Sequence, residues 1–282
     1  MPCCATTSPA VKLGKMMTGH FGPPIRPAMF ETSLNTSLNE SFARVSGDLK
    51  PGLILLADHA RNTLPAEYGT LGLPPQQFER HIAYDIGVEA VTRGLAQRLG
   101  CPALMATFSR LLIDPNRGAD DPTLIMRVSD GAIVPGNARI DEAERGRRIA
   151  RFHRPYHAAI AAEIDLALGK GVDPVLVSIH SFTPYWKGVA RPWHAGVLWD
   201  EDHRFAGYLL EALRAKGDLC IGDNEPYSGA LEGDTLYTHG TRRGLRHGLI
   251  EIRQDLIAQQ SGVDEWISRL APILEAFMKG GS

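Results

Sequence analysis

The chain has 282 residues, of which 44% are hydrophobic and 22% are charged, as in an ordinary globular protein. Thirty basic side chains against 32 acidic ones give a net charge of -2, which excludes a global field that attracts nucleic acid or anionic lipid. No segment approaches the roughly 18 consecutive apolar residues of a membrane span. We therefore expect a small-molecule partner, without nucleic acid or membrane. Composition leaves the oligomeric state open.

The N-terminal segment differs in composition from the rest of the chain. Residues 1–48 are rich in Pro, Ser, Thr and Asn, which predicts an N-terminal arm before a single α/β domain over residues 49–282. No apolar stretch follows the early lysines, so we predict no secretory signal. Four scattered cysteines without a C-x-x-C pair fit a reducing cytoplasm. The expected location is cytoplasmic.

From residue 52 onward, apolar runs alternate with helical patterns, which predicts a mostly parallel or mixed central sheet with helices on both faces. The long helical pattern before Gly169 contains Pro155, which predicts an interruption or kink there. In chain order, the predicted elements are strand 52–57, helix 75–99, strands 103–108 and 111–113, helix 141–168, strands 174–179 and 195–199, helix 202–216, strand 249–252 and helix 263–278.

Three predicted strands end in side chains that can do chemistry. His59 follows the first strand, His180 follows strand 174–179, and Glu251 lies on the last one. Ligands of open α/β sheets bind at the carboxyl ends of the strands. Two histidines and a nearby carboxylate suit zinc, which leaves a position open for water in catalytic sites. We therefore predict that His59 and His180 bind one Zn²⁺, or another divalent metal, per chain.

The third metal ligand is expected in the segment that contains His81 and Asp85. On a predicted helix these residues are spaced i and i+4 and point to one face. We predict Asp85 as the ligand and His81 as a partner of the ligands or a substrate contact; the alternatives are His81 as ligand or a surface pair. Asn62, three residues after His59, is either a weak oxygen ligand or a residue that fixes the loop.

Glu251 lies among apolar residues on a predicted buried strand. An ionised carboxylate is costly there unless it has a partner, which indicates a chemical role. We predict that Glu251 takes a proton from the zinc-bound water and returns it to the leaving amine. The alternative is an internal ion pair with Arg253 or Arg243.

Six motifs together resemble the N-formylglutamate amidohydrolase family over about residues 50–258. They are the segments 56–62, 81–87, 109–117, 178–184, 222–228 and 249–255. The resemblance implies a zinc-peptidase-like (phosphorylase/hydrolase-like) fold and hydrolysis of an N-acyl amide bond, as in the release of formate from N-formyl-L-glutamate during histidine catabolism. The order of His59, Asp85, His180 and Glu251 also resembles that in zinc-type N-acetylmuramoyl-alanine amidases, with Asp for Glu at position 85.

A substrate of this kind carries carboxylates, which arginine binds through its planar fork. The candidates are Arg110, Arg117, Arg191 and Arg253, with solvation at the surface as the alternative for each. Asn116-Arg117 resembles the pair with which zinc carboxypeptidases hold a terminal carboxylate. Tyr227 is predicted to donate a hydrogen bond to substrate, or else is a loop aromatic.

Two further patterns help to delimit the function. His153 and His157 are spaced i and i+4 as a metal pair would be, but no acidic strand end accompanies them, so we favour packing or hydrogen bonding. No Gly-x-Ser-x-Gly elbow is present, which disfavours a serine hydrolase. The prediction is a zinc-dependent amidohydrolase that cleaves N-formyl-L-glutamate. The alternatives are a related zinc amidase for another N-acyl amino acid or a cell-wall peptide, and a non-catalytic carboxylate-binding homologue.

Overall fold

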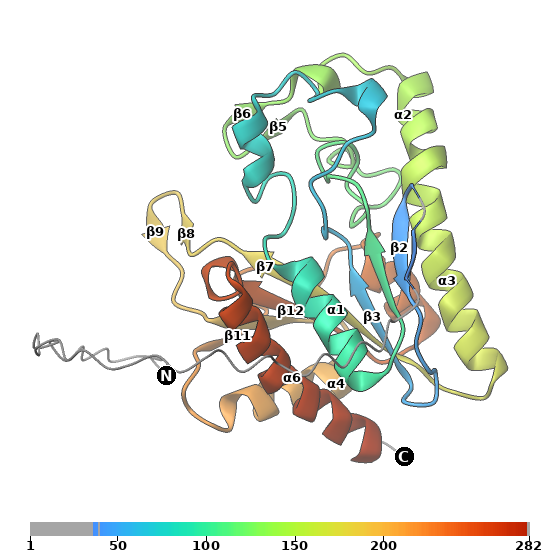
Figure 1. The fold of residues 1–282 in the computed structure, drawn as a ribbon, viewed down its shortest axis with the longest axis vertical. Helices are drawn as coiled ribbons and strands as arrows, with labels where there is room; N and C mark the ends of the chain where they lie inside the picture. The colour runs from blue at the N-terminus through green and yellow to red at the C-terminus, as the bar shows by residue number, and fades with distance from the viewer. Residues whose placement is uncertain (1–35, 39, 281–282) are drawn as a thin grey trace, which may run out of the picture.

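The computed structural model describes residues 36–38 and 40–280, and it is organised around one eight-stranded mixed sheet (Figure 1). The strand order is β1-β2-β4-β3-β7-β12-β10-β11. The four central strands β4, β3, β7 and β12 are parallel, whereas β2 and β10 run antiparallel to their central neighbours. The strands are β1 (Thr36–Leu38), β2 (Phe42–Val45), β3 (Leu53–Ala57), β4 (Ala103–Ala106), β7 (Val175–Phe182), β10 (Ala195–Leu198), β11 (Ile221–Asp223) and β12 (His247–Arg253).

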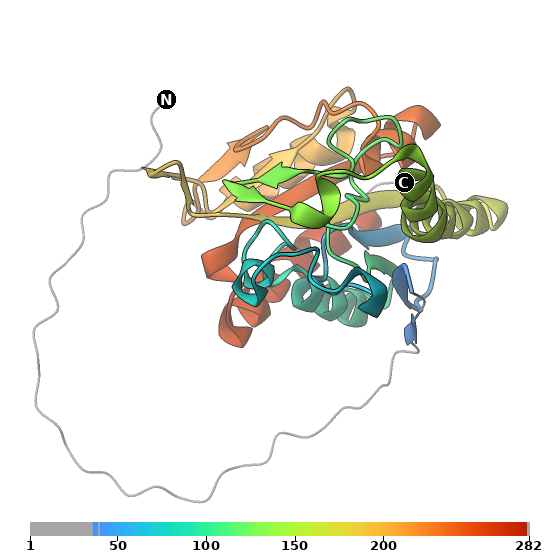
Figure 2. The same cartoon turned by 90° about the horizontal axis from the view of Figure 1, so that it is seen from above.

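Helices cover both faces of the sheet (Figure 2), which confirms the predicted fold class. On one face lie α1 (Val88–Leu99), α4 (His203–Arg214) and α6 (Gln260–Gly280). On the other face lie α3 (Arg154–Gly169) and the short α5 (Thr235–His239). Among the described residues, no helix is both long and apolar enough to cross a membrane.

The remaining elements are short. Two small hairpins stand apart from the main sheet, and 3-10 turns occupy several connections. The hairpin strands are β5 (Val128–Ser129), β6 (Ala132–Ile133), β8 (Tyr185–Trp186) and β9 (Val189–Ala190). The 3-10 segments are Ala66–Tyr68, Pro75–Glu79, Pro135–Asn137, Thr241–Arg243 and Gln254–Leu256.

Alternation of side chains along the central strands decides which face receives the polar groups. On β7, Val177 and Ile179 pack in the core beneath α1 and α6. Successive side chains of a strand point to opposite faces, so His180 points to the other side. Glu251 on β12 is the register partner of His180, and it follows the same alternation. The two polar side chains therefore lie next to each other on the face that α3 and α5 cover.

The sheet extends into the segment that was predicted as an arm. β1 pairs with β2, and β2 pairs with β4, so residues before position 49 belong to the sheet and the predicted domain start is too late. Along β2, buried and partly buried residues alternate over only four positions, which is too short for a clear sequence pattern. Residues 1–35, 39 and 281–282 lie outside the described residues, and so does most of the predicted arm.

The predicted helix over residues 75–99 is wrong in its first half. Pro75–Glu79 forms a 3-10 turn, and residues 80–87 form turns before α1 begins at Val88. Gly87 adopts a left-handed conformation with φ +83°, and a Cβ there would lie 2.3 Å from the carbonyl oxygen of Ile257. The amide of Asp85 donates to the carbonyl of His59 at 2.9 Å instead of to a helical partner. This contact attaches the segment to the end of β3.

Residues 111–113 do not form the predicted strand, although all three are buried. Side chains satisfy the backbone carbonyls there. Asn137 donates to the carbonyl of Leu111 at 2.8 Å, and Arg148 donates to that of Leu112 at 2.9 Å. Buried backbone groups need partners, but those partners need not be a neighbouring strand.

The long helical pattern is interrupted near Pro155, as predicted. It divides into α2 (Glu142–Arg148), a π-helical turn at Ile149–His153, and α3. Asp141 caps α2 by accepting from the amide of Glu144 at 2.8 Å. Pro155 lies in the first turn of α3, directly after the π-helical turn.

Candidate active site

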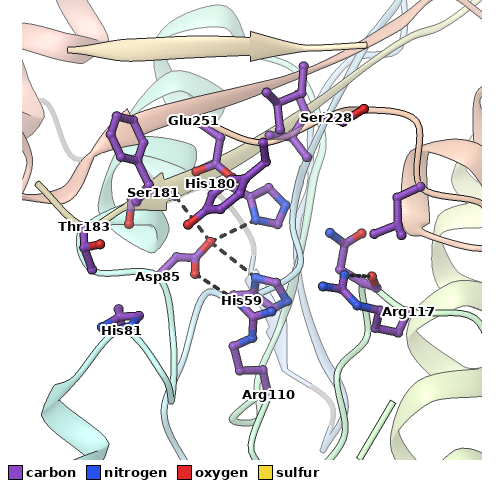
Figure 3. Close-up of a pocket in the computed structure, with 16 residues that line it drawn as sticks. His59, His81, Asp85, Arg110, Arg117, His180, Ser181, Thr183, Ser228 and Glu251 are labelled. Atoms are coloured by element: carbon purple, nitrogen blue, oxygen red, sulfur yellow. Dashed lines mark hydrogen bonds and ion pairs between the residues drawn. The ribbon is translucent and has the colours of Figure 1, made fainter. Parts of the chain in front are cut away.

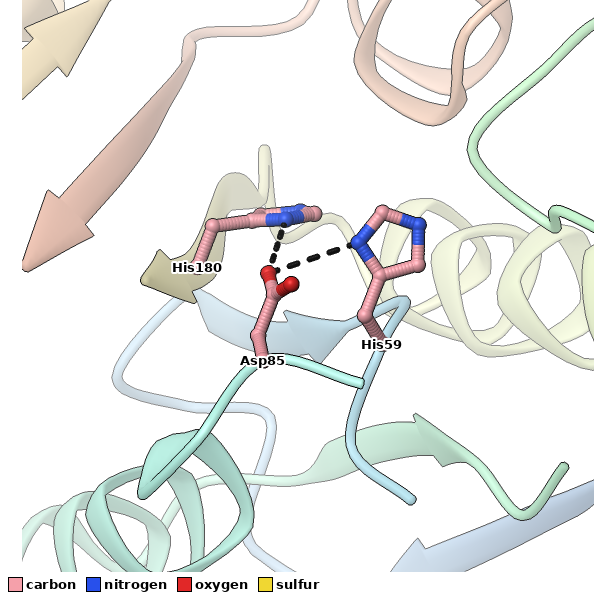
Figure 4. Close-up of side chains that lie close together, drawn as sticks. All are labelled: His59, Asp85 and His180. Carbon is pink, nitrogen blue, oxygen red and sulfur yellow. Dashed lines mark hydrogen bonds and ion pairs between the residues drawn. The ribbon is translucent and has the colours of Figure 1, made fainter. Parts of the chain in front are cut away.

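Three polar side chains converge at the carboxyl ends of the central strands (Figure 4). Asp85 Oδ2 lies 3.3 Å from Nδ1 of His59 and 2.9 Å from Nδ1 of His180. One possible ligand atom from each residue lies within 4.8 Å of the others, and all three residues are buried. Two imidazole nitrogens and a carboxylate oxygen are a donor set for zinc and similar divalent ions. We call these three residues the candidate metal centre.

A carboxylate contacts the second ring nitrogen of each histidine. Nε2 of His59 lies 2.7 Å from Asp114 Oδ1, and Nε2 of His180 lies 3.0 Å from Asp58 Oδ2. Metal-binding histidines usually donate their other N–H to a carboxylate or carbonyl, which fixes the tautomer and the ring orientation. The surroundings of both rings thus fit a pair of metal ligands that present Nδ1 to the ion.

Asp58 is the most connected side chain beneath the candidate metal centre. Besides contacting His180, it accepts hydrogen bonds from the hydroxyls of Tyr156 at 3.0 Å, Ser178 at 3.1 Å and Thr235 at 2.7 Å. Burial opposes ionisation of Asp58, but the hydrogen bond and charge of His180 outweigh it and lower the pKa of the carboxyl. Asp58 is therefore anionic at neutral pH.

Asp114 has a similar set of partners beside His59. It accepts from Arg110 at 2.7 Å and from the backbone amide of Asn116 at 2.9 Å. Burial raises the pKa of this carboxyl, but the charges of Arg110 and His59 lower it by more. The pKa of Asp114 therefore lies well below its usual range. A second buried anion thus orients the second imidazole.

Glu251 stands beside the centre without a partner of its own (Figure 3). Its side chain is buried, and Oε2 has no hydrogen-bond partner among the described residues. Burial raises the pKa of Glu251 to about 7. Neither Arg243 nor Arg253 forms an ion pair with it: Arg243 contacts Asp165, and Arg253 contacts Asp255. The alternative of an internal ion pair with these arginines is therefore wrong.

The candidate metal centre and Glu251 line a cavity of about 260 Å³. This volume is below the roughly 300–1,000 Å³ of sites for drug-sized ligands, so the space suits a small molecule. The lining residues are His59, His81, Asp85, Arg110, Asn116, Arg117, His180, Ser181, Phe182, Thr183, Leu198, Tyr227, Ser228, Leu231, Leu249 and Glu251.

The family model described as N-formylglutamate amidohydrolase matches residues 52–258, which contain every lining residue of this cavity. The chain belongs to the N-formylglutamate amidohydrolase family. The predicted resemblance is thereby confirmed, and membership supports an amidohydrolase activity. No curated protein matches the chain at a significant level.

Two solved structures are similar in fold to this chain over most of their length. The gene product Atu2144 from Agrobacterium tumefaciens is 31% identical, with a TM-score of 0.80 over 86% of this chain and 96% of that chain. An N-formylglutamate amidohydrolase from Ralstonia eutropha JMP134 is 22% identical, with a TM-score of 0.68 over 86% of this chain and 98% of that chain. The second likeness shows a shared fold.

The structure brings most of the predicted substrate-binding residues to the cavity wall. Asn116, Arg117 and Tyr227 line it. Arg117 donates to the carbonyl of Asn116 at 2.7 Å and has no ion pair among the described residues. Arg110 also lines the cavity, but Asp114 at 2.7 Å and Asp85 at 3.7 Å oppose its charge. Arg117 is thus the lining arginine without an ion pair among the described residues.

Arg191 lies behind Tyr227, outside the lining. It donates to the hydroxyl of Tyr227 at 3.0 Å, and its guanidinium stacks on the rings of Tyr227, Trp186 and Phe182 at 4.9, 5.4 and 5.6 Å. Such cation–π contacts hold a guanidinium in place. Arg191 is buried, so the surface alternative does not apply to it.

Two predicted site residues lie away from the cavity. Arg253 does not line it, and its guanidinium pairs with Asp255 at 2.8 and 3.2 Å. Asn62 donates to the carbonyl of Phe78 at 2.8 Å, which corresponds to the expected role of fixing a loop. His81 lines the cavity in a turn, 3.6 Å from Asp130 Oδ2, and is not among the three converging groups.

Sequence reasoning missed Asp58 and Asp114 as partners of the histidines. The signal for Asp58 was its place directly before His59, after a buried strand. Asp114 had no local signal, because its contact with His59 spans 55 positions. Both residues lie inside the motifs that resemble the family, at 56–62 and 109–117, but the motifs alone do not indicate what either carboxylate contacts.

Neutralising either of these carboxylates is expected to weaken metal binding. Asp58→Asn and Asp114→Asn should each lower metal affinity about 10–100-fold, since partners of this kind orient the ligands and raise their basicity. Titration against a competing chelator measures the change. Asp173→Asn, at an exposed carboxylate, is the control and should bind metal like the unaltered protein. Unchanged affinity in both buried variants would show that the two contacts do not serve a metal.

Proposed function

We propose that the chain is a metal-dependent hydrolase that cleaves the amide bond of N-formyl-L-glutamate to give formate and L-glutamate. The observation that carries the proposal is the unpartnered carboxylate of Glu251 beside the three converging groups in a small cavity. Membership of the N-formylglutamate amidohydrolase family supports the type of bond. The same resemblance supports a place in histidine catabolism, and the four scattered cysteines without a C-x-x-C pair support a cytoplasmic location.

The residues present fit one divalent ion. His59 and His180 would bind it through Nδ1 and Asp85 through a carboxylate oxygen, while Asp114 and Asp58 hold the imidazoles. Zinc is the proposed metal, since it favours nitrogen and carboxylate ligands. When bound, such an ion polarises an acyl oxygen and lowers the pKa of water toward neutrality.

Glu251 is the proposed general base and acid. It is the register partner of His180 on the neighbouring strand, so its carboxylate is held at the cavity on a rigid element. A free oxygen can accept a proton from the attacking water and then return it to the amide nitrogen as the bond breaks. A carboxylate engaged in an ion pair would lack this capacity.

The cationic groups of the cavity are proposed to bind the substrate carboxylates. Arg117 lines the cavity across from Glu251 (Figure 3), and it has no ion pair among the described residues, so its guanidinium can bind an anion. Asn116 lies next to it, and Arg191 supports Tyr227 on another part of the wall. Since arginine binds carboxylates in bidentate fashion, an N-acyl derivative of an acidic amino acid fits these groups better than a neutral one. Arg110 remains a proposed contact; a role for Arg253 would require its pair with Asp255 to open.

The test is a panel of N-formyl and N-acetyl amino acids, assayed for amine release with metal-free and metal-reloaded protein. We expect hydrolysis that depends on metal and is fastest for N-formyl-L-glutamate. The neutral isostere N-formyl-L-glutamine should be slower by about tenfold or more, as expected when a charged hydrogen bond worth roughly 1.5–3 kcal/mol is lost. Faster hydrolysis of another acyl amino acid, or of a cell-wall peptide, would show that the proposed reaction is right and that the proposed substrate is wrong. Ligand binding without hydrolysis after reloading would indicate a non-catalytic homologue.

A further inference from the structure

Three histidines form a cluster outside the candidate metal centre. His153 lies in the π-helical turn, His157 on α3 and His239 at the end of α5. The ring centroids of His153 and His157 are 4.3 Å apart, and those of His157 and His239 are 5.1 Å apart, with an angle of 18° between the two ring planes. The histidine cluster, as we call these three residues, is not used by the reaction proposed above.

Hydrogen bonds of the histidine cluster end on the backbone of the segment 115–117. His153 Nε2 lies 2.8 Å from the carbonyl oxygen of Arg117, and His157 Nε2 lies 2.9 Å from that of Pro115. A carbonyl only accepts, so both Nε2 atoms carry the proton. In a neutral ring, His157 Nδ1 then accepts from His239 Nε2, which lies 2.9 Å away. One tautomer of each ring satisfies every contact.

The surroundings keep the three rings neutral. Burial lowers the pKa of His157 to about 3 and that of His239 to about 4, and it lowers the pKa of His153. The charged groups that act on the cluster are of both signs: Asp58, Asp114, Asp165, Arg145 and Arg243. Neutral rings can hold the hydrogen bonds described above throughout the neutral pH range.

The segment that the cluster holds carries two cavity residues. Asn116 is fixed further by its amide, which donates to Asp114, and by its side-chain oxygen, which accepts from the amide of Thr235 at 3.0 Å. Arg117, in contrast, has one backbone contact of this kind with the part of the chain that the structure describes, from His153 to its carbonyl. The direction in which Arg117 leaves the backbone therefore depends on His153.

We propose that His153 and His157, supported by His239, are positioning residues that hold Arg117 and Asn116 in the orientation that receives a substrate carboxylate. This inference rests on the proposed function, in which Arg117 binds the anion. The same contacts argue against a metal site at His153 and His157. Each ring of the cluster donates its Nε2 proton to a carbonyl or to a neighbouring ring. Among the described residues, no carboxylate completes a metal-ligand set with these rings.

The test compares His153→Leu, which loses the donor, with His153→Gln, whose amide N–H can replace it. We expect His153→Leu to raise KM for N-formyl-L-glutamate about 3- to 10-fold, the effect of one lost hydrogen bond, with kcat within about twofold and metal content unchanged. His153→Gln should restore KM to within about twofold. His203→Gln, at an exposed histidine on α4, is the control and should match the unaltered protein.

A double-mutant cycle with Arg117→Ala separates positioning from general structural support. If His153 acts through Arg117, replacing His153 by Leu should have little further effect on KM once Arg117 is Ala. Additive effects, or an unchanged KM in His153→Leu, would overturn the proposal while the proposed function stands.

Hydrogen exchange of the amides of residues 116–118 provides a measurement that does not depend on the substrate. We expect faster exchange in His153→Leu and rescue by His153→Gln. If the unaltered protein cleaves no N-acyl amino acid, the proposed function fails, and exchange still decides whether the cluster holds the segment. Exchange that is the same in both variants and in the unaltered protein would overturn that role.

Discussion

Glu251→Gln is expected to lower kcat about 10²–10⁴-fold, equivalent to about 3–5 kcal/mol of barrier, while metal and fold are retained. Glutamine has nearly the shape of glutamate and still forms hydrogen bonds, but it cannot accept and return a proton. Steady-state kinetics beside metal analysis and a melting temperature measure the three quantities together. Near-normal turnover in the folded, metal-loaded variant would place the base elsewhere, with His81 the next candidate.

The same variant should melt at a higher temperature than the unaltered protein when both are metal-free at pH 8. Burial raises the folded-state pKa of Glu251 to about 7, above its value in the unfolded chain. The folded state thus binds more protons between these two pKa values, and stability falls as the pH rises through this window. Glutamine removes that cost. Glu163→Gln is the matched control: Glu163 is equally buried but pairs with Arg44 at 2.7 Å, so its neutralisation should lower the melting temperature and leave kcat unchanged.

His59→Ala and His180→Ala are each expected to abolish stable metal binding and activity together. Each removes one of two nitrogen donors, and the remaining two groups do not form a tight site. The chain should stay folded, since neither side chain belongs to the two hydrophobic cores. Its melting temperature should still fall, because the carboxylates beside the lost ring become unpaired. Metal analysis after dialysis, with circular dichroism, measures both effects.

Asp85→Ala and His81→Ala complete this comparison at the third ligand. Asp85→Ala should weaken metal retention, whereas His81→Ala should affect activity more than metal content. The reverse pattern would make His81 the ligand. Near-stoichiometric metal in both His59→Ala and His180→Ala would show that the metal does not bind at the candidate metal centre.

The sequence was most informative where a buried strand ends in a polar residue. β3 is a continuous apolar run that His59 follows, whereas β7 and β12 are mostly apolar strands that contain His180 and Glu251. A polar group in such a place must have a partner or a function, so the strands and the residues were predictable together. The parallel order of the strands then brought the three side chains to one edge of the sheet.

Other parts of the site depend on contacts that no local pattern records. Asp85 reaches the centre from a turn, because a left-handed glycine and a contact with His59 replace the expected helix. Arg253 was predicted just after strand 249–252 and is the last residue of β12, but the nearby Asp255 engages its charge. β1 and β2 were missed because strands of three and four residues carry too little alternation to be read.

The connections of Asp58 also determine when the centre can form during folding. Its partners Tyr156, Ser178, His180 and Thr235 lie 98, 120, 122 and 177 positions later in the chain. Closing such long loops costs chain entropy before the contacts can stabilise the closed loop. We therefore expect these hydrogen bonds to form late in folding. A fragment that stops before Thr235 leaves a buried anion with an incomplete set of donors. If the candidate metal centre binds its ion as proposed, metal uptake would therefore report that nearly the whole chain has reached its native arrangement.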